Sequence, residues 1–398
     1  MLKKFSLVAA AGIMLSALAG CNKPTAVTLK VWQPLAEQTI LAEMAAAFQE
    51  EHPEWDITFD LGVVEEPDLK STLTLDVEAG ADVFAFPDDQ LVDLINAGAL
   101  SQVQQFRSVV EARDVEWAVA AATKDDKLYA YPETADNGYF LYYDSSKLTE
   151  TEVLTLDAMI AKAETLDASI HFGTAGGWMS ASWFLTEGNI SYDGTTQTMD
   201  WNNAAGLASA QGMWDAYGSE RLITSGDFAQ LFTEESIIAA VTGTWEATNI
   251  SEALGENYAA TKLPTFTNGD DEQQQLGSFV GAKLVGVNAY TEFPEVAHAF
   301  AEFITNEDNQ LLRAQTRGLG PSNLAAGASD VLSSNVALAG LAAQAPYGSL
   351  QSTSVGGSYW APMGAFSDAM VNNELPTGIT TIQEALDILV AQATASAS

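Results

Sequence analysis

The sequence predicts an α/β protein of two lobes, each an open sheet with helices on both faces. The chain has 398 residues, 47% of them hydrophobic, and this length exceeds what one hydrophobic core usually spans. Strand-like and helix-like stretches alternate along the chain, which is typical of sheets whose parallel strands are joined by helices. The sequence shows no internal repeat and no long linker.

The first strand–helix–strand unit follows from the period of its apolar residues. Residues 25–32 alternate apolar and polar side chains as a strand does, and residues 37–51 place apolar side chains on one helical face. His52-Pro53 ends this helix, and residues 56–61 alternate again. Such a unit predicts parallel pairing of the two strands with a right-handed crossover.

The same pattern repeats once more. Residues 67–78 are predicted as a helix and residues 82–86 as a short apolar strand, followed by a helix that Asp88 or Asp89 caps and that Gly98 follows. In open α/β sheets, ligands bind beyond the carboxyl ends of the strands. Trp32 and the run Phe86-Pro87-Asp88-Asp89 lie at such ends.

The later elements are predicted from shorter patterns. Strands are expected at 128–132, 139–143 and 236–242, helices at 203–217, 294–304 and 381–392, and loops at 173–194 (with a short helix) and 348–357.

The composition excludes several functions. Acidic residues outnumber basic ones 53 to 16, which gives a formal net charge of −37. A surface of this charge repels nucleic acid and anionic lipid headgroups, so no nucleic-acid partner is expected. A solvated acidic shell is the simplest explanation of the charge.

The N-terminus has the pattern of a secretory signal. Lys3 and Lys4 precede an apolar stretch at 5–19 that is too short to span a bilayer, and small residues follow it. Leu18-Ala19-Gly20-Cys21 resembles the bacterial lipobox, whose cysteine is diacylated. Residues 1–20 are therefore predicted as a signal peptide and 21–26 as a lipidated tether. The alternative is an ordinary signal peptide with an incidental cysteine, but Cys21 is the only cysteine in the chain. The expected location is the outer face of the cell membrane.

Several stretches, in their order along the chain, resemble one known family. They are Leu29-Lys30-Val31-Trp32, Gly80-Ala81-Asp82-Val83-Phe84, Leu128-Tyr129-Ala130-Tyr131-Pro132 with Thr134-Ala135-Asp136-Asn137 and Leu141-Tyr142-Tyr143-Asp144, Ala239-Ala240-Val241-Thr242-Gly243-Thr244-Trp245, Leu263-Pro264-Thr265-Phe266, and Gly277-Ser278-Phe279-Val280-Gly281. The family is that of the extracellular solute-binding proteins (family 1) of the maltose/maltodextrin-binding type, receptors of ABC sugar importers.

This resemblance implies the two-lobed periplasmic-binding fold of type II, with a hinge between the lobes. The N-lobe would contain 27–132 plus 267–318 and the C-lobe 138–262 plus 322–398, with crossings near 133–137, 263–266 and 319–321. It further implies that an oligosaccharide binds in the cleft, that the lobes close on it by hinge motion, and that the closed form delivers it to permease subunits. The receptor is expected to be a monomer without cofactor or metal. The exact sugar is left open, because Gln90 stands where the maltodextrin receptor has a basic residue.

The resemblance also implies the residues of the site. Sugar rings stack on aromatic faces, and their hydroxyls donate to carboxylates and amides. The stacking residues would be Trp32, Phe86, Trp178, Trp245, Tyr359 and Trp360, and the hydroxyl-binding residues Glu37, Asp89, Asp136 and Asn137. Ordinary core packing is the alternative for the tryptophans among these residues, and helix capping is the alternative for Asp88 and Asp89.

An enzyme is not expected. The chain contains neither a G-x-S-x-G nor an H-E-x-x-H motif, and its three histidines, His52, His171 and His298, are isolated in sequence. A glycosidase needs only two carboxylates, so the sequence alone leaves that activity open. The other open alternatives are a receptor for a polyamine, peptide or metal, and a purely structural surface lipoprotein.

Overall fold

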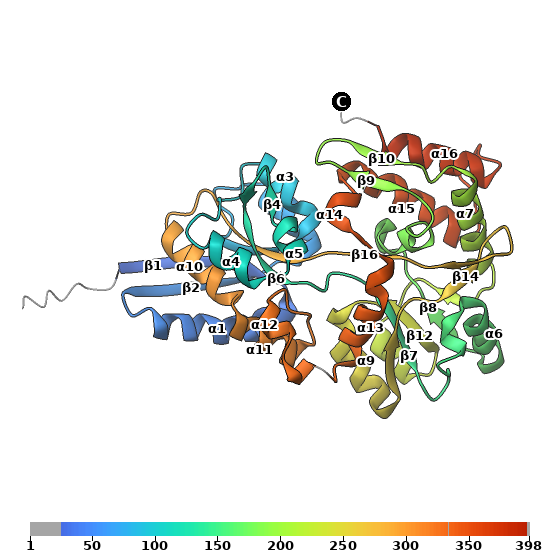
Figure 1. Ribbon diagram of the computed structural model, residues 1–398, viewed down its shortest axis with the longest axis horizontal. Helices are drawn as coiled ribbons and strands as arrows, with labels where there is room; N and C mark the ends of the chain where they lie inside the picture. Colours follow the sequence, from blue (N-terminus) through green and yellow to red (C-terminus); the bar gives the residue numbers. More distant parts are fainter. Residues whose placement is uncertain (1–24, 333, 396–398) are drawn as a thin grey trace, which may run out of the picture.

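The computed structural model describes residues 25–332 and 334–395, and it shows two α/β lobes side by side (Figure 1). Each lobe is built on a five-stranded sheet. The predicted two-lobed α/β fold is therefore confirmed. The expected signal peptide and Cys21 lie outside the described residues.

The N-lobe sheet has the strand order β2-β1-β3-β17-β6. Strands β1 (Thr25–Gln33), β2 (Trp55–Val63) and β3 (Val83–Pro87) are parallel. Strand β17 (Lys283–Val287) is antiparallel to β3 and to β6 (Ala130–Thr134). The carboxyl ends of β1, β3 and β6 and the start of β17 therefore lie at one edge of the sheet.

The C-lobe sheet has the strand order β11-β8-β12-β7-β13. Its strands are β7 (Phe140–Asp144), β8 (Ser169–His171), β11 (Leu222–Ile223), β12 (Ile237–Thr242) and β13 (Tyr258–Thr261). Strand β12 is parallel to β8 but antiparallel to β7. The antiparallel strands β7 and β17 correspond, because each is the first sheet strand after the chain crosses between lobes.

Helices cover both sheets. In the N-lobe they are α1 (Gln38–Glu51), α2 (Leu69–Leu73), α3 (Leu91–Asn96), α4 (Arg107–Arg113), α5 (Glu116–Ala121), α10 (Pro294–Ile304), α11 (Glu307–Arg317) and α12 (Leu324–Gly327). In the C-lobe they are α6 (Leu156–Leu166), α7 (Ala204–Tyr217), α8 (Phe228–Thr233), α9 (Ala247–Leu254), α13 (Val336–Gln344), α14 (Gln351–Ser354), α15 (Gly357–Val371) and α16 (Ile382–Ala393). Within the described ranges, no helix is both long enough and apolar enough to cross a bilayer.

Four predicted helices are confirmed to within one residue at each end: α1, α7, α10 and α16. Local chemistry explains their starts. The Asn203 side chain accepts a hydrogen bond from Gly206 N at the start of α7, and Thr381 and Glu384 form a capping box on α16.

Two local predictions are wrong. The helix expected over 67–78 ends as α2 at Leu73, because the chain turns at Asp76, whose carboxylate accepts a hydrogen bond from Ala79 N. The loop expected over 348–357 instead contains strand β18 (Gly348–Leu350), which pairs with β16 (Ser278–Val280), and then helix α14. Backbone pairing across the lobe junction thus orders a stretch that looks like a flexible loop in sequence.

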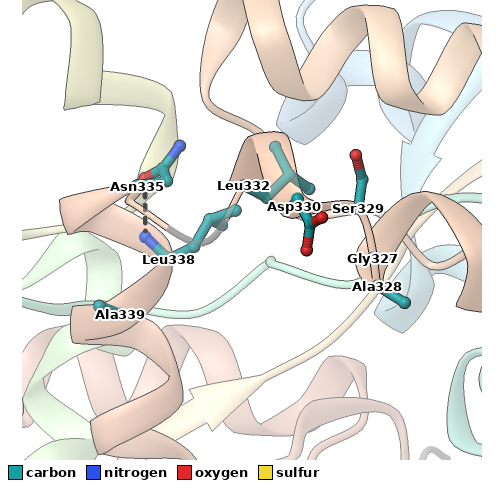
Figure 2. Close-up of a pocket in the computed structure, with 8 residues that line it drawn as sticks. All are labelled: Gly327, Ala328, Ser329, Asp330, Leu332, Asn335, Leu338 and Ala339. Atoms are coloured by element: carbon teal, nitrogen blue, oxygen red, sulfur yellow. Dashed lines mark hydrogen bonds between the residues drawn. The ribbon is translucent and has the colours of Figure 1, made fainter.

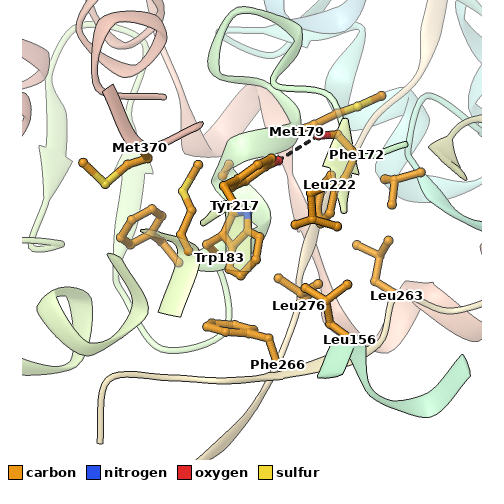
Figure 3. Packing of buried hydrophobic residues seen from close by; sticks show 14 of the residues in the cluster. Leu156, Phe172, Met179, Trp183, Tyr217, Leu222, Leu263, Phe266, Leu276 and Met370 are labelled. Carbon is orange, nitrogen blue, oxygen red and sulfur yellow. Dashed lines mark hydrogen bonds between the residues drawn. The ribbon is translucent and has the colours of Figure 1, made fainter. Parts of the chain in front are cut away.

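The segment that links β6 to β7 is the first crossing, as expected near 133–137. The crossing expected near 263–266 is wrong. Leu263 and Phe266 pack in the C-lobe core together with Trp183 and Leu276 (Figure 3). A hairpin of β14 (Thr265–Thr267) and β15 (Gln273–Gln275) prolongs the C-lobe, so the chain returns to the N-lobe only at 281–282, between β16 and β17.

The third crossing also lies later than expected. Residues 319–321 run beside the first crossing, where Gly320 N donates a hydrogen bond to Asp136 Oδ2 at 2.6 Å. The chain then stays with the N-lobe, because Asn323 N donates to Gln310 Oε1 and α12 packs on α11. It enters the C-lobe at α13, so residues 322–332 belong to the N-lobe.

Candidate functional site

The two lobes meet at the strand ends of the N-lobe sheet, and the residues on both sides of this contact define the lobe junction. On the N-lobe side, the 3-10 helix η3 (Asp88–Gln90) directly follows β3. On the C-lobe side, Trp178 precedes η6 (Met179–Trp183), and Trp245 lies in η7 (Thr244–Glu246). Helix α14 packs against η3 and so brings the two sides together.

Two of the predicted aromatic residues form a pair at the junction. The ring centroids of Trp178 and Trp245 are 5.8 Å apart, and both side chains are partly buried. Trp178 Nε1 donates a hydrogen bond to Gln351 Oε1 at 2.6 Å. A Cβ on Gly243 would lie 2.0 Å from the Trp245 ring, so only glycine lets this ring fold back over the turn. The Thr-Gly-Thr-Trp turn after β12 therefore sets the position of Trp245.

The acidic residues after β3 are buried at the junction. Asp88 is 1% exposed, and neither of its carboxylate oxygens has a well-aligned hydrogen-bond partner, although Ser352 and the backbone of Ala282 lie close to it. Burial first, and the adjacent Asp89 second, raise the pKa of Asp88 well above its usual value. Burial raises the pKa of Asp89 to about 7, although the Lys70 charge opposes this rise. Neither side chain makes a helix-capping hydrogen bond, so capping does not explain them.

Unpaired polar atoms are concentrated at the junction. Among the described residues, eleven buried side-chain nitrogen and oxygen atoms have no hydrogen-bond partner, and seven of these lie at N-lobe strand ends or in the segments that link the lobes. The seven are Gln33 Oε1, Asp88 Oδ1 and Oδ2, Asp89 Oδ1, Thr134 Oγ1, Asp136 Oδ1 and Ser278 Oγ. Buried polar atoms without partners are rare in folded proteins, and each needs an explanation such as a ligand.

The hinge residues Asp136 and Asn137 are brought to the same place. Asp136 is 1% exposed, and its Oδ2 accepts hydrogen bonds from Thr244 Oγ1 of the C-lobe and from Gly320 N. Asn137 N donates to Gly281 O at 3.0 Å. These bonds join the first crossing to the return crossing and leave Asp136 Oδ1 unpaired.

Sequence reasoning missed two buried basic residues. Arg313 is 1% exposed, and its Nη2 lies 2.7 Å from Glu133 Oε1. Lys283 Nζ lies 3.1 Å from Glu66 Oε2. Burial alone would lower the pKa of Lys283, but Glu66 and the other nearby carboxylates outweigh burial and raise it. The chain has only 16 basic residues, and this scarcity is the one sequence signal that could have drawn attention to them.

The structure gives Glu37 a different role from the predicted one. Its Oε2 accepts a hydrogen bond from Arg313 Nε at 3.1 Å, and Arg317 Nη1 lies 3.9 Å from its Oε1. Glu37 as a whole is 6% exposed, and its carboxylate lies next to these two guanidinium groups. Glu37 therefore holds Arg313 in place beside Glu133.

Two predicted stacking residues are core residues, which corrects the prediction. Phe86 is 0% exposed and packs in the hydrophobic core of the N-lobe. Tyr359 is also 0% exposed, and its hydroxyl donates a hydrogen bond to Gly177 O in the C-lobe. All four apolar residues of β3 before Pro87 are buried, because helices cover both faces of the sheet. Tyr359 lies in the first turn of α15 and faces the C-lobe core.

The remaining two predicted aromatic residues are half-buried away from the pair. Trp32 lies against Gly62 of β2, and Trp360 packs edge-on to Tyr359 with centroids 5.0 Å apart. No ring contact joins either of them to Trp178 or Trp245 within the part of the chain that the structure describes. Trp178 and Trp245 therefore lie together at the junction, whereas Trp32 and Trp360 do not join them, and stacking of a sugar on any of the four stays a prediction.

Two cavities lie along the links between the lobes. One of about 300 Å³ is lined by Trp117, Ala135, Asp136, Asn137, Gly138, Val280, Gly281, Leu341, Ala345, Gly348 and Leu350. The other, of about 320 Å³, lies at the third link and is lined by small and apolar side chains with Asp330 and Asn335 (Figure 2). Only the first cavity includes predicted site residues, namely Asp136 and Asn137.

Comparison with known families gives a match over most of the chain. A family model described as "Bacterial extracellular solute-binding protein" matches residues 43–340. The galactooligosaccharide-binding protein of Bacillus subtilis is 27% identical over 308 residues, which is 72% of this chain and 70% of that protein. The maltodextrin-binding protein MdxE of Bacillus subtilis is 25% identical over 352 residues, 82% of each chain.

Solved structures agree in fold. A structure with acarbose superposes with a TM-score of 0.82 at 26% identity and covers 92% of this chain and 98% of that one. The Thermus thermophilus maltotriose-binding protein, bound with maltotriose, has a TM-score of 0.77 at 18% identity, with coverage of 92% and 99%. The named relatives are binding proteins rather than enzymes, which confirms that expectation for this chain.

Proposed function

The chain belongs to the family of bacterial extracellular solute-binding proteins, and from this membership we propose that it captures an oligosaccharide between its two lobes and delivers it to an ABC importer. The relatives that are named for galactooligosaccharide, maltodextrin and maltotriose support a saccharide ligand.

The unpaired polar atoms at the lobe junction support this function most directly. Five of the seven atoms are amide or carboxylate oxygens, which accept hydrogen bonds. A ligand rich in hydroxyl groups supplies the matching donors. The Trp178–Trp245 pair adds flat apolar surface of the kind on which a sugar ring stacks.

Residues from both lobes contribute to the proposed site. Asp88, Asp89 and Lys283 belong to the N-lobe, whereas Trp178, Trp245 and Gln351 belong to the C-lobe. A ligand that contacts both sets binds the closed arrangement more tightly than an open one, and it therefore shifts the population towards closure. Closure then gives the permease subunits a shape that depends on bound sugar.

We propose that Cys21 anchors the protein to the outer face of the membrane through lipid. The Leu-Ala-Gly-Cys sequence and the absence of any other cysteine from the chain support this. Metabolic labelling with a radioactive fatty acid should mark the wild-type protein and leave Cys21→Ala unlabelled. An unlabelled wild type would contradict the anchor without affecting the proposed ligand.

A polyamine receptor is the second candidate, because carboxylates outnumber basic groups at the junction. A thermal-shift screen against oligosaccharides, amino acids and polyamines separates the two candidates. The proposed function predicts that a maltodextrin or galactooligosaccharide raises the melting temperature, whereas amino acids do not. A response to polyamines alone would contradict it.

A further inference from the structure

Two adjacent carboxyl groups at the lobe junction, those of Asp88 and Asp89, form no ion pair within the described part of the chain. Asp88 and Asp89 follow β3 side by side, and none of the ion pairs among the described residues includes either of them. Asp88 is buried to 99%, since its exposed fraction is 1%. Three of the four carboxylate oxygens of this pair are buried without a well-aligned hydrogen-bond partner, although Ser352 lies close to Asp88 and Gln351 close to Asp89. Burial disfavours the ionised form of both carboxyl groups, and a positive partner would favour that form.

The basic residues around the junction are already engaged. Lys70 Nζ lies 2.7 Å from Asp93 Oδ2, and Lys283 Nζ lies 3.1 Å from Glu66 Oε2. Arg313 is held between Glu37 and Glu133. Each of these basic groups therefore already has a carboxylate partner, and among the described residues none forms an ion pair with Asp88 or Asp89.

Further polar atoms lie close to Asp88, around Gly281 in the return crossing. Asp88 Oδ1 would lie 2.6 Å from a Cβ built on Gly281, and Asn137 Nδ2 would lie 3.4 Å from that position. Gly281 and Asn137 both line the cavity of about 300 Å³. Asp136, which also lines this cavity, is 1% exposed and keeps its Oδ1 unpaired. The unpaired acceptors thus surround the segment that joins the lobes.

A metal ion does not fit these acceptors. Within residues 25–332 and 334–395, no group of three His, Cys, Asp or Glu side chains is placed to hold one. A hydroxyl group can donate a single hydrogen bond to a carboxyl oxygen, but it brings no charge that would favour the ionised form of these two carboxyl groups, whose pKa values burial raises. A protonated amine supplies both a positive charge and N–H donors.

We propose that the saccharide bound by this protein carries a basic nitrogen, whose protonated form pairs with Asp88 and Asp89 between the lobes. This rests on the proposed oligosaccharide function and narrows it to an aminated saccharide. The neighbouring Trp178–Trp245 pair stacks on the sugar rings and attracts a positive charge close to its ring faces.

Titration calorimetry on the whole protein at pH 7 tests the inference with three probes. Maltotetraose is a neutral oligosaccharide, acarbose is a saccharide of similar size with a secondary amine in its backbone, and spermidine is an amine without sugar. Since a hydrogen bond to a charged group contributes more than a neutral one, acarbose is expected to bind roughly 10- to 100-fold more tightly than maltotetraose.

The variants Asp88→Asn and Asp89→Asn keep the side-chain shape and remove the charge. In each variant, the affinities for acarbose and maltotetraose should differ by no more than about threefold. Asp68→Asn is the matched control, because Asp68 is exposed and lies outside the junction. It removes one negative charge and should keep the full preference.

Different outcomes test the aminated ligand and the proposed oligosaccharide binding separately. Equal affinity of the wild type for acarbose and maltotetraose would overturn the inference and leave oligosaccharide binding standing. An unchanged preference in both folded Asn variants would also overturn it. Binding of spermidine without either saccharide would contradict the proposed function itself. If an Asn variant melts too low to be titrated, the other variant and the wild-type ratio still decide.

Discussion

Lys283 and Trp245 face each other across the lobe junction, with Lys283 Nζ 5.9 Å from the centroid of the Trp245 ring. Lys283 begins β17 of the N-lobe and is held by Glu66, whereas Trp245 follows β12 of the C-lobe. The Trp245 ring is thus positioned from its own lobe by Gly243 and from the opposite lobe by a paired ammonium group. The surroundings of the Trp245 ring therefore depend on both lobes and should change when the lobes move relative to each other.

Trp245→Ala should weaken oligosaccharide binding while leaving the fold intact. Removal of one stacking ring is expected to cost about 1–3 kcal/mol of binding free energy, or roughly a 5- to 150-fold loss of affinity. Calorimetry measures the affinity, and a melting curve measures the stability.

Trp183→Ala is the matched control for Trp245→Ala, because Trp183 is 0% exposed and packs in the C-lobe core. It should lose about 3–5 kcal/mol of stability. A large loss of stability in Trp245→Ala with normal affinity would show that Trp245 is a core residue and not a stacking surface.

Arg313→Met should destabilise the N-lobe strongly. The substitution leaves Glu133 buried without its ion-pair partner and leaves Glu37 with Arg317 alone, and breaking a buried pair in this way costs about 3–5 kcal/mol. Urea denaturation should show a much lower midpoint. Arg107→Met is the control, because Arg107 pairs with Glu111 on the surface and should lose at most about 1 kcal/mol. Equal losses in the two variants would contradict the structural role of Arg313.

The protein should lose stability as the pH rises from about 4 to about 7, because Asp89 loses its proton over this range. Its pKa in the folded protein is about 7, above the ordinary value of 3.8, so the folded state binds this proton more tightly than the unfolded state. The stabilisation is full below the unfolded pKa and is lost as the pH rises through the folded pKa. Glu133, whose pKa burial also raises to about 7, acts in the same direction.

Melting curves between pH 4 and pH 8 check this dependence. Asp89→Asn should flatten it in part, while Asp167→Asn, a substitution at a side chain that is 94% exposed, controls for the loss of one negative charge. The assignment fails if Asp89→Asn and Asp167→Asn change the pH dependence equally.

Salt should stabilise the protein. The formal net charge of −37 makes the compact state repel itself. Raising NaCl from 0.1 M to 1 M shortens the screening length from about 10 Å to about 3 Å, so the melting temperature should rise. Sucrose at equal osmolality is the control for solvent effects, and a rise of the same size in sucrose would show that screening is not the cause.

The sequence was sufficient for the alternation of strands and helices because apolar periodicity records which faces are buried. The Thr-Gly-Thr-Trp sequence also contains the glycine that the position of the Trp245 ring requires, while the role of that ring in binding stays a prediction. The sequence failed for Phe86 because a strand covered on both faces is apolar throughout, so its pattern does not show which side chains reach a ligand.

Tertiary pairing decided the rest. The return crossing lies later than the predicted 263–266, because residues 265–275 fold back as a hairpin on the C-lobe. Lys283 and Arg313 are separated in sequence from their partners by more than a hundred residues, and no local pattern marks such pairs. The unpaired oxygens of Asp88 likewise became visible only when both lobes were in place.

The most direct test of an interlobe oligosaccharide site is a crystal structure of the protein with the saccharide that gives the largest thermal shift. We predict a sugar ring against the Trp178–Trp245 pair, with hydroxyl or amine groups at Asp88 and Asp89, and contacts from both lobes. A saccharide bound to one lobe alone, away from these residues, would contradict this site and the closure mechanism that depends on it.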